Sequence, residues 1–205
     1  MRAWAVGEHL FVQADLEFEE PHAFVEARGV FPEMAFTDPP WNAGIAAMFR
    51  RKADDPRKVN LDVLLAGVAL AHRGVAGDVW IEFAADPSPM IRAMRDDGWN
   101  AIVSFATTYE RGEREESLTL FSQDMREPTA SPDPPDSPYL PGWAISHSSA
   151  RGEYVLDACT GYGLTTKAAL KSGRRFVGFE LTDSRLDRAI TFAENHEKKG
   201  RVRVH

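Results

Sequence analysis

The 205-residue sequence predicts an α/β fold with a mostly parallel central sheet and helices on both faces. Short apolar runs of strand length alternate with longer stretches of helical spacing. Two of the apolar runs, Met34–Thr37 and Tyr154–Ala158, lead directly into loops rich in proline or glycine. Apolar residues make up 43% and charged residues 27% of the chain, which is ordinary for a globular protein.

The first part of the chain alternates strands and helices as far as Ser122. Leu61, Leu64 and Val68 recur at helical spacing after Asn60, which can cap that helix, and Ser88 is placed to cap the next. The expected strands are His9–Ala14, Met34–Thr37, Asp78–Ala84, Asn100–Thr107 and Ser117–Ser122, and the expected helices are Pro21–Ala27, Ala43–Arg50, one from Leu61, and Ser88–Asp97.

The composition changes between Glu127 and Pro141, where six prolines stand among serine and aspartate. Proline lacks the backbone N–H, so we expect an extended linker or surface loop there. Strand and helix patterns resume at Tyr154–Ala158, Gly163–Ser172, Arg175–Phe179 and Ser184–Lys198. The expectation is one domain over residues 1–205, with a first half at 1–122, a loop at 123–142 and a second half at 143–205.

The tetrapeptide Asp38-Pro39-Pro40-Trp41 follows a buried strand directly, and ligands bind at the carboxyl ends of strands in open α/β sheets. An aromatic amine is a poor nucleophile because its lone pair is conjugated into the ring, and two acceptors on its hydrogens would help to release that pair. Asp38 offers a carboxylate, and Pro39 offers a carbonyl held extended by Pro40. Trp41 offers a flat stacking surface. The motif therefore predicts binding of an aromatic amine. The alternative is that Pro39-Pro40 ends a strand and Trp41 packs in the core.

A second motif runs from Val155 to Gly163, where a strand breaks into a glycine-rich turn and then a helix. Gly161 and Gly163 allow a close approach of the backbone to a ligand. Glu180 follows Gly161 by nineteen residues, at the end of the next strand, which is the spacing of an acid that accepts hydrogen bonds from ribose hydroxyls. Thr166 stands where a dinucleotide site has its third glycine. A nucleoside without phosphates, such as S-adenosylmethionine, is therefore favoured over a dinucleotide.

Together the motifs resemble those of the amino-methyltransferases that make N6-methyladenine or N4-methylcytosine in nucleic acids. That family has Asp/Asn/Ser-Pro-Pro-aromatic at a strand end and a donor motif like Asp-Pro-Phe-x-Gly-x-Gly-Thr-Thr. Residues 157–165 read Asp-Ala-Cys-Thr-Gly-Tyr-Gly-Leu-Thr, and residues 173–180 are similar to the family's Gly-Arg-x-Phe-Ile-Gly-x-Glu. The catalytic motif comes first, as in the permuted β-type enzymes. The resemblance covers residues 9–195 and implies a Rossmann-like, circularly permuted methyltransferase fold with S-adenosyl-L-methionine as cofactor.

The resemblance also implies roles for individual residues. Asp38, Pro39, Pro40 and Trp41 would hold the target base. Two assignments have plain alternatives, because Ser148 suits an ordinary surface and His147 suits a helix end. The residues expected to contact the donor are Asp15, Asp38, His147, Ser148, Asp157, Ala158, Cys159, Thr160, Gly161, Gly163, Thr165 and Glu180.

An aspartate at the first position of the catalytic motif usually accompanies adenine in this family. Adenine N6 in DNA is therefore favoured over cytosine N4, RNA or a protein amide. Ala158 and Leu164 depart from the family pattern by small changes. The segment Gln123–Gly142 is short for a target-recognition region, so either recognition is brief or a second subunit, such as a partner or another copy of this chain, provides it. A catalytically silent partner subunit is the non-enzymatic alternative.

The formal net charge of −7 is unfavourable for holding nucleic acid, so local basic patches would have to provide the contacts. The basic block Arg50, Arg51, Lys52, Arg57 and Lys58 lies just past Trp41. We expect it to contact phosphates while the target base is flipped out of the duplex. A solvated surface run is the alternative.

Cysteine and histidine usage favours neither a disulfide framework nor a metal site. Cys159 is the only cysteine, and the six histidines are scattered without ligand spacing. No charged-then-apolar leader opens the sequence, and the longest apolar stretch, Leu61–Ala71, is about half of a membrane span. The expected location is the cytoplasm, with no membrane and no metal partner.

Overall fold

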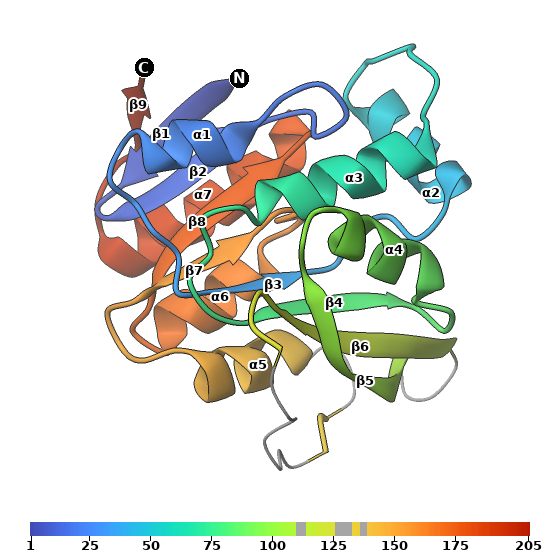
Figure 1. Ribbon diagram of the computed structural model, residues 1–205. Coiled ribbons are helices and arrows are strands. Elements are labelled where there is room, and N and C mark those ends of the chain that lie inside the picture. Colours follow the sequence, from blue (N-terminus) through green and yellow to red (C-terminus); the bar gives the residue numbers. More distant parts are fainter. Residues whose placement is uncertain (110–113, 126–132, 136–138) are drawn as a thin grey trace.

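The computed structural model describes residues 1–109, 114–125, 133–135 and 139–205, which build a nine-stranded sheet in the order β5-β6-β4-β3-β7-β8-β2-β1-β9 (Figure 1). The strands are β1 (Arg2–Val6), β2 (His9–Gln13), β3 (Met34–Thr37), β4 (Val79–Ala84), β5 (Asn100–Tyr109), β6 (Arg114–Ser122), β7 (Tyr154–Asp157), β8 (Arg175–Glu180) and β9 (Val202–Val204). The helices are α1 (Pro21–Glu26), α2 (Ala43–Lys52), α3 (Leu61–Ala71), α4 (Ser88–Asp96), α5 (Leu140–Ser148), α6 (Leu164–Lys171) and α7 (Asp183–Glu197).

The five central strands, β4, β3, β7, β8 and β2, pair in parallel, and the strands outside them pair antiparallel. Strand β7, from the second half of the chain, lies between β3, from the first half, and β8. Because parallel strands end at the same edge, Asp38 after β3, Asp157 in β7 and Glu180 in β8 arrive side by side.

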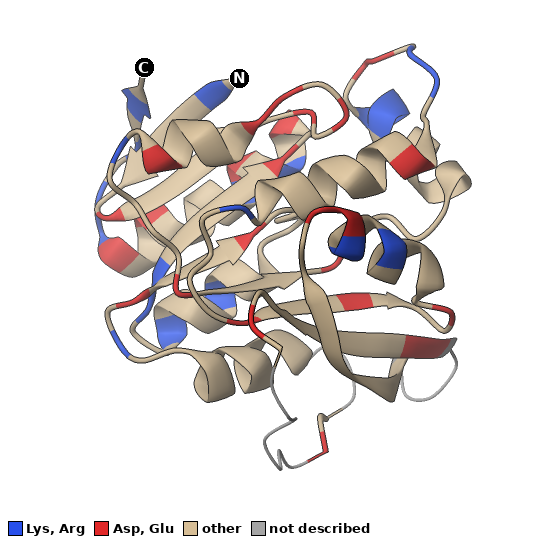
Figure 2. Ribbon diagram, in the orientation of Figure 1, with Lys and Arg blue, Asp and Glu red and all other residues tan. Residues whose placement is uncertain are grey.

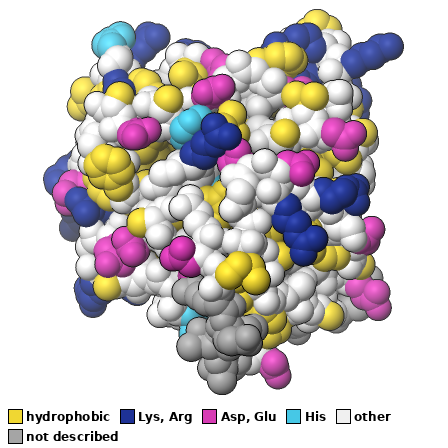
Figure 3. Space-filling model, viewed as in Figure 1, with side chains coloured by type: hydrophobic (Ala, Val, Ile, Leu, Met, Phe, Trp, Pro, Cys, Tyr) yellow, Lys and Arg dark blue, Asp and Glu magenta, His cyan; other side chains and the backbone are white. Residues whose placement is uncertain are grey.

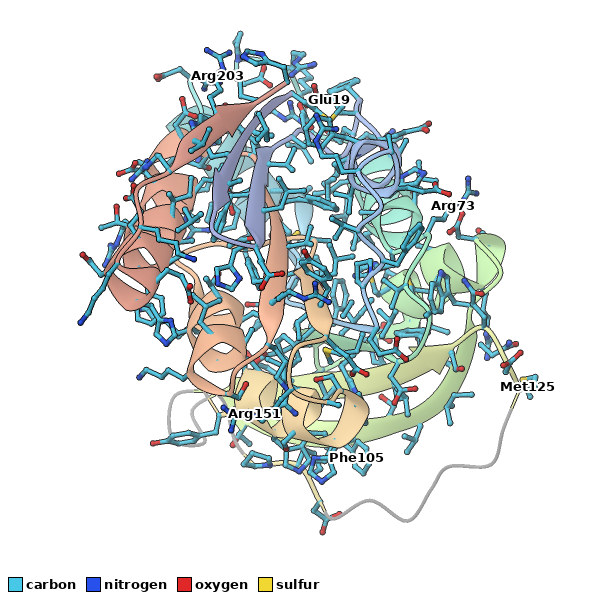
Figure 4. The ribbon with its side chains drawn as sticks, turned by 90° about the vertical axis from the view of Figure 1, so that its left-hand side faces the viewer. Glu19, Arg73, Phe105, Met125, Arg151 and Arg203 are labelled. Atoms are coloured by element: carbon cyan, nitrogen blue, oxygen red, sulfur yellow. The ribbon has the colours of Figure 1, made fainter. Side chains whose placement is uncertain are left out.

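Two helical layers cover the sheet (Figure 1). Helices α1, α3 and α4 bury apolar side chains such as Val68 and Met94 against one face. Helices α5, α6 and α7 bury Ile145, Leu170 and Ile190 against the other. Figure 4 shows the long axis of the sheet from its side, with Arg203 in β9 at one end and Phe105 in β5 at the other, near α5. The expected α/β fold with helices on both faces is confirmed.

Each strand and helix expected from the sequence is present, with bounds that differ by a few residues. Asn60 caps α3 as expected, since its Oδ1 accepts from the N–H of Asp62 at 3.1 Å. Ser88 is the first residue of α4 rather than its cap; its N–H donates to Oδ1 of Asp86 at 3.0 Å, and the cap position is Pro87. Strands β1 and β9 and helix α5 were not expected.

The proline-rich stretch is described only in part, because residues 126–132 and 136–138 lie outside the described residues, as do three of the six prolines of the expected recognition segment. Helix α5 begins at Leu140, so Pro141 belongs to a helix and not to the loop in which it was expected. Proline is tolerated there because the first turn of a helix needs no donor. In the part of the chain that is described, no helix is both long and apolar enough to cross a membrane.

Candidate functional site

A cavity of about 360 Å³ opens at the carboxyl edge of the central strands. Both sequence motifs contribute to its wall, so two segments far apart in the chain form one site. The lining comprises Asp38, Pro39, Pro40 and Trp41 from the first motif, and Asp157, Ala158, Cys159, Thr160, Gly161 and Thr165 from the second, with Asp15 and Glu180 beside them. Nearly all the expected base-holding and donor-contacting residues therefore come together.

The loop between β3 and α2 holds the first motif in place. Asn42 caps α2 by accepting from the N–H of Ile45 at 2.9 Å, which fixes where the loop ends. Within the loop, Nε1–H of Trp41 donates to Oδ1 of Asp38 at 2.9 Å. Pro39 is buried, whereas Asp38 is exposed. The indole thus orients the carboxylate that faces the cavity.

Thr37 joins this loop to the second motif. Its Oγ1 accepts from the N–H of Ala158 at 3.1 Å and lies 2.9 Å from Nε2 of His72. Because the Ala158 N–H already uses Oγ1 as an acceptor, we infer that the hydroxyl proton is donated to His72. His72 is fully buried, and burial lowers its pKa to about 4, so the ring is neutral and can accept.

The turn after β7 is held by backbone groups bonded to buried acceptors. Oδ1 of Asp157 accepts from the N–H of Cys159 at 2.9 Å. Glu180 accepts from two backbone N–H groups, Gly161 at 2.9 Å through Oε2 and Thr182 at 2.8 Å through Oε1. The carboxylate of Glu180 therefore fixes both the glycine turn and the start of α7, while each of its oxygens has a further lone pair to offer.

The glycines near the cavity serve different purposes. Gly161 has φ +53°, and a Cβ there would meet only Cys159 O at 3.7 Å and Arg185 Nη1 at 3.8 Å, so its backbone is open to a ligand. Gly163 does not line the cavity; a Cβ there would come within 3.0 Å of Ala189 in α7. The structure therefore gives Gly163 a packing role between α6 and α7, and its expected donor contact stays a prediction.

Carboxylates make this end of the cavity electronegative. Burial raises the pKa of Asp157 to about 7, and the negative charges of Asp38 and Glu180 add to the rise, against hydrogen bonds from Thr165 and the Cys159 N–H. Burial and the same carboxylates raise the pKa of the Cys159 thiol well above its usual value. A cationic ligand would relieve the repulsion between these carboxylates.

Two expected donor contacts lie elsewhere. Ser148 Oγ donates to Oδ2 of Asp78 and accepts from Nε1 of Trp80, both at 2.8 Å, at the amino end of β4. The His147 ring lies tilted by 38° against Trp143, with 4.5 Å between centroids, and its Nδ1 lies 2.7 Å from the Trp143 carbonyl. Helix α5 points its first turn, with Pro141, at the cavity and its last turn away from it, so neither residue lines the cavity.

The basic block after Trp41 is partly neutralised by neighbouring acids. Arg50 is 3% exposed and ion-paired with Asp15 at 2.8 Å, with Glu17, and with Asp55 at 2.5 Å. It is therefore removed from the expected phosphate contacts. Arg57 is half exposed but bonded to Asp55 and Asp15 at 2.7 and 2.8 Å. Figure 2 shows this mixture of signs on the loop after α2. The other members, Arg51, Lys52 and Lys58, are exposed.

Four lining residues with chemically useful side chains were not singled out from the sequence. Glu82 of β4 lies one register step from the loop that holds Asp38–Trp41, because Thr37 pairs with Ile81. Phe49, Tyr162 and Arg185 meet at the rim, where the Arg185 guanidinium lies 4.1 Å from the Phe49 centroid and 4.4 Å from that of Tyr162. Tyr162 in the glycine turn was a usable signal, because an aromatic residue between two glycines stands out; the others depend on tertiary packing.

Comparison with known proteins gives structural but not sequence similarity. No protein-family model matches the chain, and no curated protein matches its sequence. M1.HpyAVI matches with a TM-score of 0.60 at 16% identity, over 89% of this chain and 97% of that one. TTHA0409 of Thermus thermophilus, described as a candidate DNA modification methylase, matches at 0.58 and 19%, over 92% and 95%. The cytosine-N4-specific PvuII DNA methyltransferase matches at 0.60 and 11%, over 95% and 93%. The chain therefore has the α/β fold of S-adenosylmethionine-dependent methyltransferase structures.

Proposed function

We propose that this protein transfers a methyl group from S-adenosyl-L-methionine to an exocyclic amino nitrogen of a nucleobase, adenine N6 in DNA. The observation that carries the proposal is the convergence of Asp38–Trp41 with Asp157, Gly161 and Glu180 around one cavity. The structures of M1.HpyAVI and TTHA0409 with S-adenosylmethionine support it, since both proteins share the fold.

The cavity fits the proposed cofactor in size and charge. About 360 Å³ lies within the usual range for a small-molecule site. S-adenosylmethionine carries a sulfonium, which is the donor of the methyl group, and the carboxylates of Asp157 and Glu180 suit such a cation. Glu180 would accept hydrogen bonds from ribose hydroxyls, and the bare backbone at Gly161 would let the donor approach.

The target amine would lie between Asp38 and the carbonyl of Pro39. Each acceptor takes one N–H, which favours localising the lone pair on nitrogen and aims it at the methyl group. The bond from Trp41 fixes the Asp38 carboxylate, and the indole plane offers a stacking surface for the base. The new N–C bond would form as the bond between sulfur and the methyl group breaks, with its electron pair left on the sulfur of the departing S-adenosylhomocysteine. The nitrogen then loses one of its protons, which exposed Asp38 can receive and pass to solvent.

The test is a labelled-donor assay followed by analysis of the product nucleosides. The full chain is incubated with methyl-labelled donor and separate pools of duplex DNA, RNA and protein, and the DNA is then digested for mass spectrometry. Label in DNA as N6-methyladenine is the expected result. N4-methylcytosine would overturn adenine as the target, and label confined to RNA or protein would overturn DNA. No label in any pool, with a folded chain, would overturn catalysis.

A further inference from the structure

Two arginines lie against the ring of Tyr162 at the rim of the cavity, and Lys52 Nζ lies 5.8 Å from the centroid of the neighbouring Phe49 ring. Lys52 ends α2, and Arg185 and Arg188 lie in the first turns of α7. The Arg188 guanidinium lies 4.5 Å from the Tyr162 ring centroid, and Arg185 lies between that ring and Phe49. A hydrogen bond from Arg185, and the positive charges of Arg185, Lys52 and Arg188, lower the pKa of Tyr162. We call Lys52, Tyr162, Arg185 and Arg188 the rim patch.

The acidic residues at the start of α7 do not neutralise the positive charge of the rim patch. The acids of the first turns of α7 are engaged elsewhere, since Asp183 pairs with Arg2 at 2.5 Å and Asp187 with Arg201 at 2.5 Å. Within the described residues, none of the three rim-patch cations forms an ion pair with a carboxylate. Arg185 and Arg188 stand three apart on one helix, a spacing at which like charges repel. An external anion would relieve this repulsion.

The chemistry of the patch suits a phosphodiester. A guanidinium stacked on an aromatic ring keeps its planar edge available, and that edge can bond two phosphate oxygens at once. Arg185 and Tyr162 line the cavity proposed to receive the base, so the patch borders the opening through which an extruded nucleotide would enter. On the described part of the face in Figure 3, acidic and basic side chains are interspersed. That face therefore offers no broad basic surface as an alternative binding site for the phosphate backbone.

We propose that the rim patch contacts the phosphate backbone of DNA beside the flipped base. This proposal rests on the proposed function. It assigns the phosphate contacts to Arg185 and Arg188, from a distant part of the chain, instead of to Arg50 and Arg57, whose charges are neutralised. Lys52 is the one member shared with the basic block expected from the sequence.

The test measures how salt weakens DNA binding by Arg188→Gln. Each phosphate contact contributes about 0.9 to the slope of log K against log salt, so losing one contact weakens binding about eightfold at 0.1 M salt. Fluorescence anisotropy with a labelled duplex, from 50 to 200 mM NaCl and with S-adenosylhomocysteine present, measures both quantities. The matched control is Arg151→Gln, because Arg151 is exposed and lies before β7, at the opposite edge of the sheet from the cavity (Figure 4). The control should keep the wild-type affinity and slope.

The outcomes separate the patch from the reaction. If the wild type methylates DNA and Arg188→Gln binds DNA like Arg151→Gln, the proposed role of the rim patch is wrong and the proposed function stands. If the wild type neither binds nor methylates DNA, both fall. Arg185→Gln adds a calorimetric check, because a loss of donor affinity with unchanged DNA binding would assign Arg185 to the donor instead. An RNA hairpin that binds through Arg188 while duplex DNA does not bind would overturn DNA as the partner.

Discussion

The two halves of the cavity are held in different ways. On the side proposed to hold the donor, buried Asp157 and Glu180 accept from backbone N–H groups of their own region, so the turn is shaped before any ligand arrives. On the target side, exposed Asp38 is oriented by an indole in the same loop. Thr37 connects the halves through the Ala158 N–H. The comparison teaches that the proposed donor side is preorganised, whereas the proposed target side presents the Asp38 carboxylate to solvent, where a base could reach it.

The sharpest way to break the comparison is to remove the acceptor from the target side alone. Asp38→Ala should lower the rate of methyl transfer by about 10²- to 10³-fold, because the amine loses an aligned acceptor in the transition state. Donor affinity, measured by calorimetry, should stay within about threefold of wild type, well below the effect of losing a charge-assisted hydrogen bond. Asp96→Ala removes a carboxylate that is also exposed, from α4, and should leave both quantities unchanged. Loss of donor binding in a folded Asp38→Ala chain would contradict the division of roles.

The second prediction concerns the buried histidine bonded to Thr37. Burial lowers the pKa of His72 from 6.5 to about 4, so the unfolded chain binds a proton there between these values while the folded chain does not. Stability from this group is therefore present above pH 6.5 and is lost as pH falls toward 4, by about 2 kcal/mol at pH 5. His72→Gln should be less stable than wild type at pH 7.5. Denaturant unfolding should show that this difference in the free energy of unfolding shrinks by that amount at pH 5.

Comparing the two proteins cancels the opposite contribution of Asp157, whose raised pKa favours the folded chain at lower pH. Thr37→Val keeps the buried imidazole but removes the hydroxyl that donates to its neutral form, so this variant should lose less stability than wild type between pH 7.5 and pH 5. An unchanged gap between wild type and His72→Gln at the two pH values would show that His72 does not titrate as the structure requires.

A third prediction sharpens the donor side. The pKa of Asp157 is raised to about 7, and a bound cation would favour its carboxylate, so donor binding should release a proton. Affinity for S-adenosylmethionine should therefore rise about tenfold between pH 6 and pH 8, as the ionised fraction of Asp157 rises. Titration calorimetry of Asp157→Asn should give weaker binding without this rise, and Asp96→Asn should retain it. A flat wild-type profile would argue against contact between Asp157 and the donor.

The smallest effect is expected at the bond that orients Asp38. Trp41→Phe keeps an aromatic surface but removes the Nε1–H that Asp38 accepts. A hydrogen bond to a charged group contributes about 1.5–3 kcal/mol when shielded from water. Solvent around this exposed carboxylate reduces that to about 1 kcal/mol, so kcat should fall roughly fivefold with donor affinity unchanged. Trp143→Phe, in the aromatic cluster of α5, is the control. A fall as large as that of Asp38→Ala would mean that Trp41 does more than orient the carboxylate.

Most of the fold could be predicted from the sequence because strand and helix patterns are local. The bounds of β3 were predicted to the residue, and those of β7 and β8 to within one. The edge strand β9 was not predicted, because it lies in a run of basic residues and only its pairing with β1 makes it a strand. Helix α5 was hidden by the prolines around its start, although Pro141 is compatible with a first helical turn.

The sequence by itself determined the chemistry of the cavity wall. The acceptors and ring of Asp38–Trp41, and the turn at Gly161 with its acid at Glu180, depend on neighbouring residues and short spacings, which a linear pattern records. Only the tertiary structure decided where those groups meet and which charges stay available. Arg50 looked like a surface cation until Asp15, Glu17 and Asp55 were found around it. The physical reason is that ion pairing depends on distance in space, and the parallel sheet, by inserting β7 between β3 and β8, sets those distances.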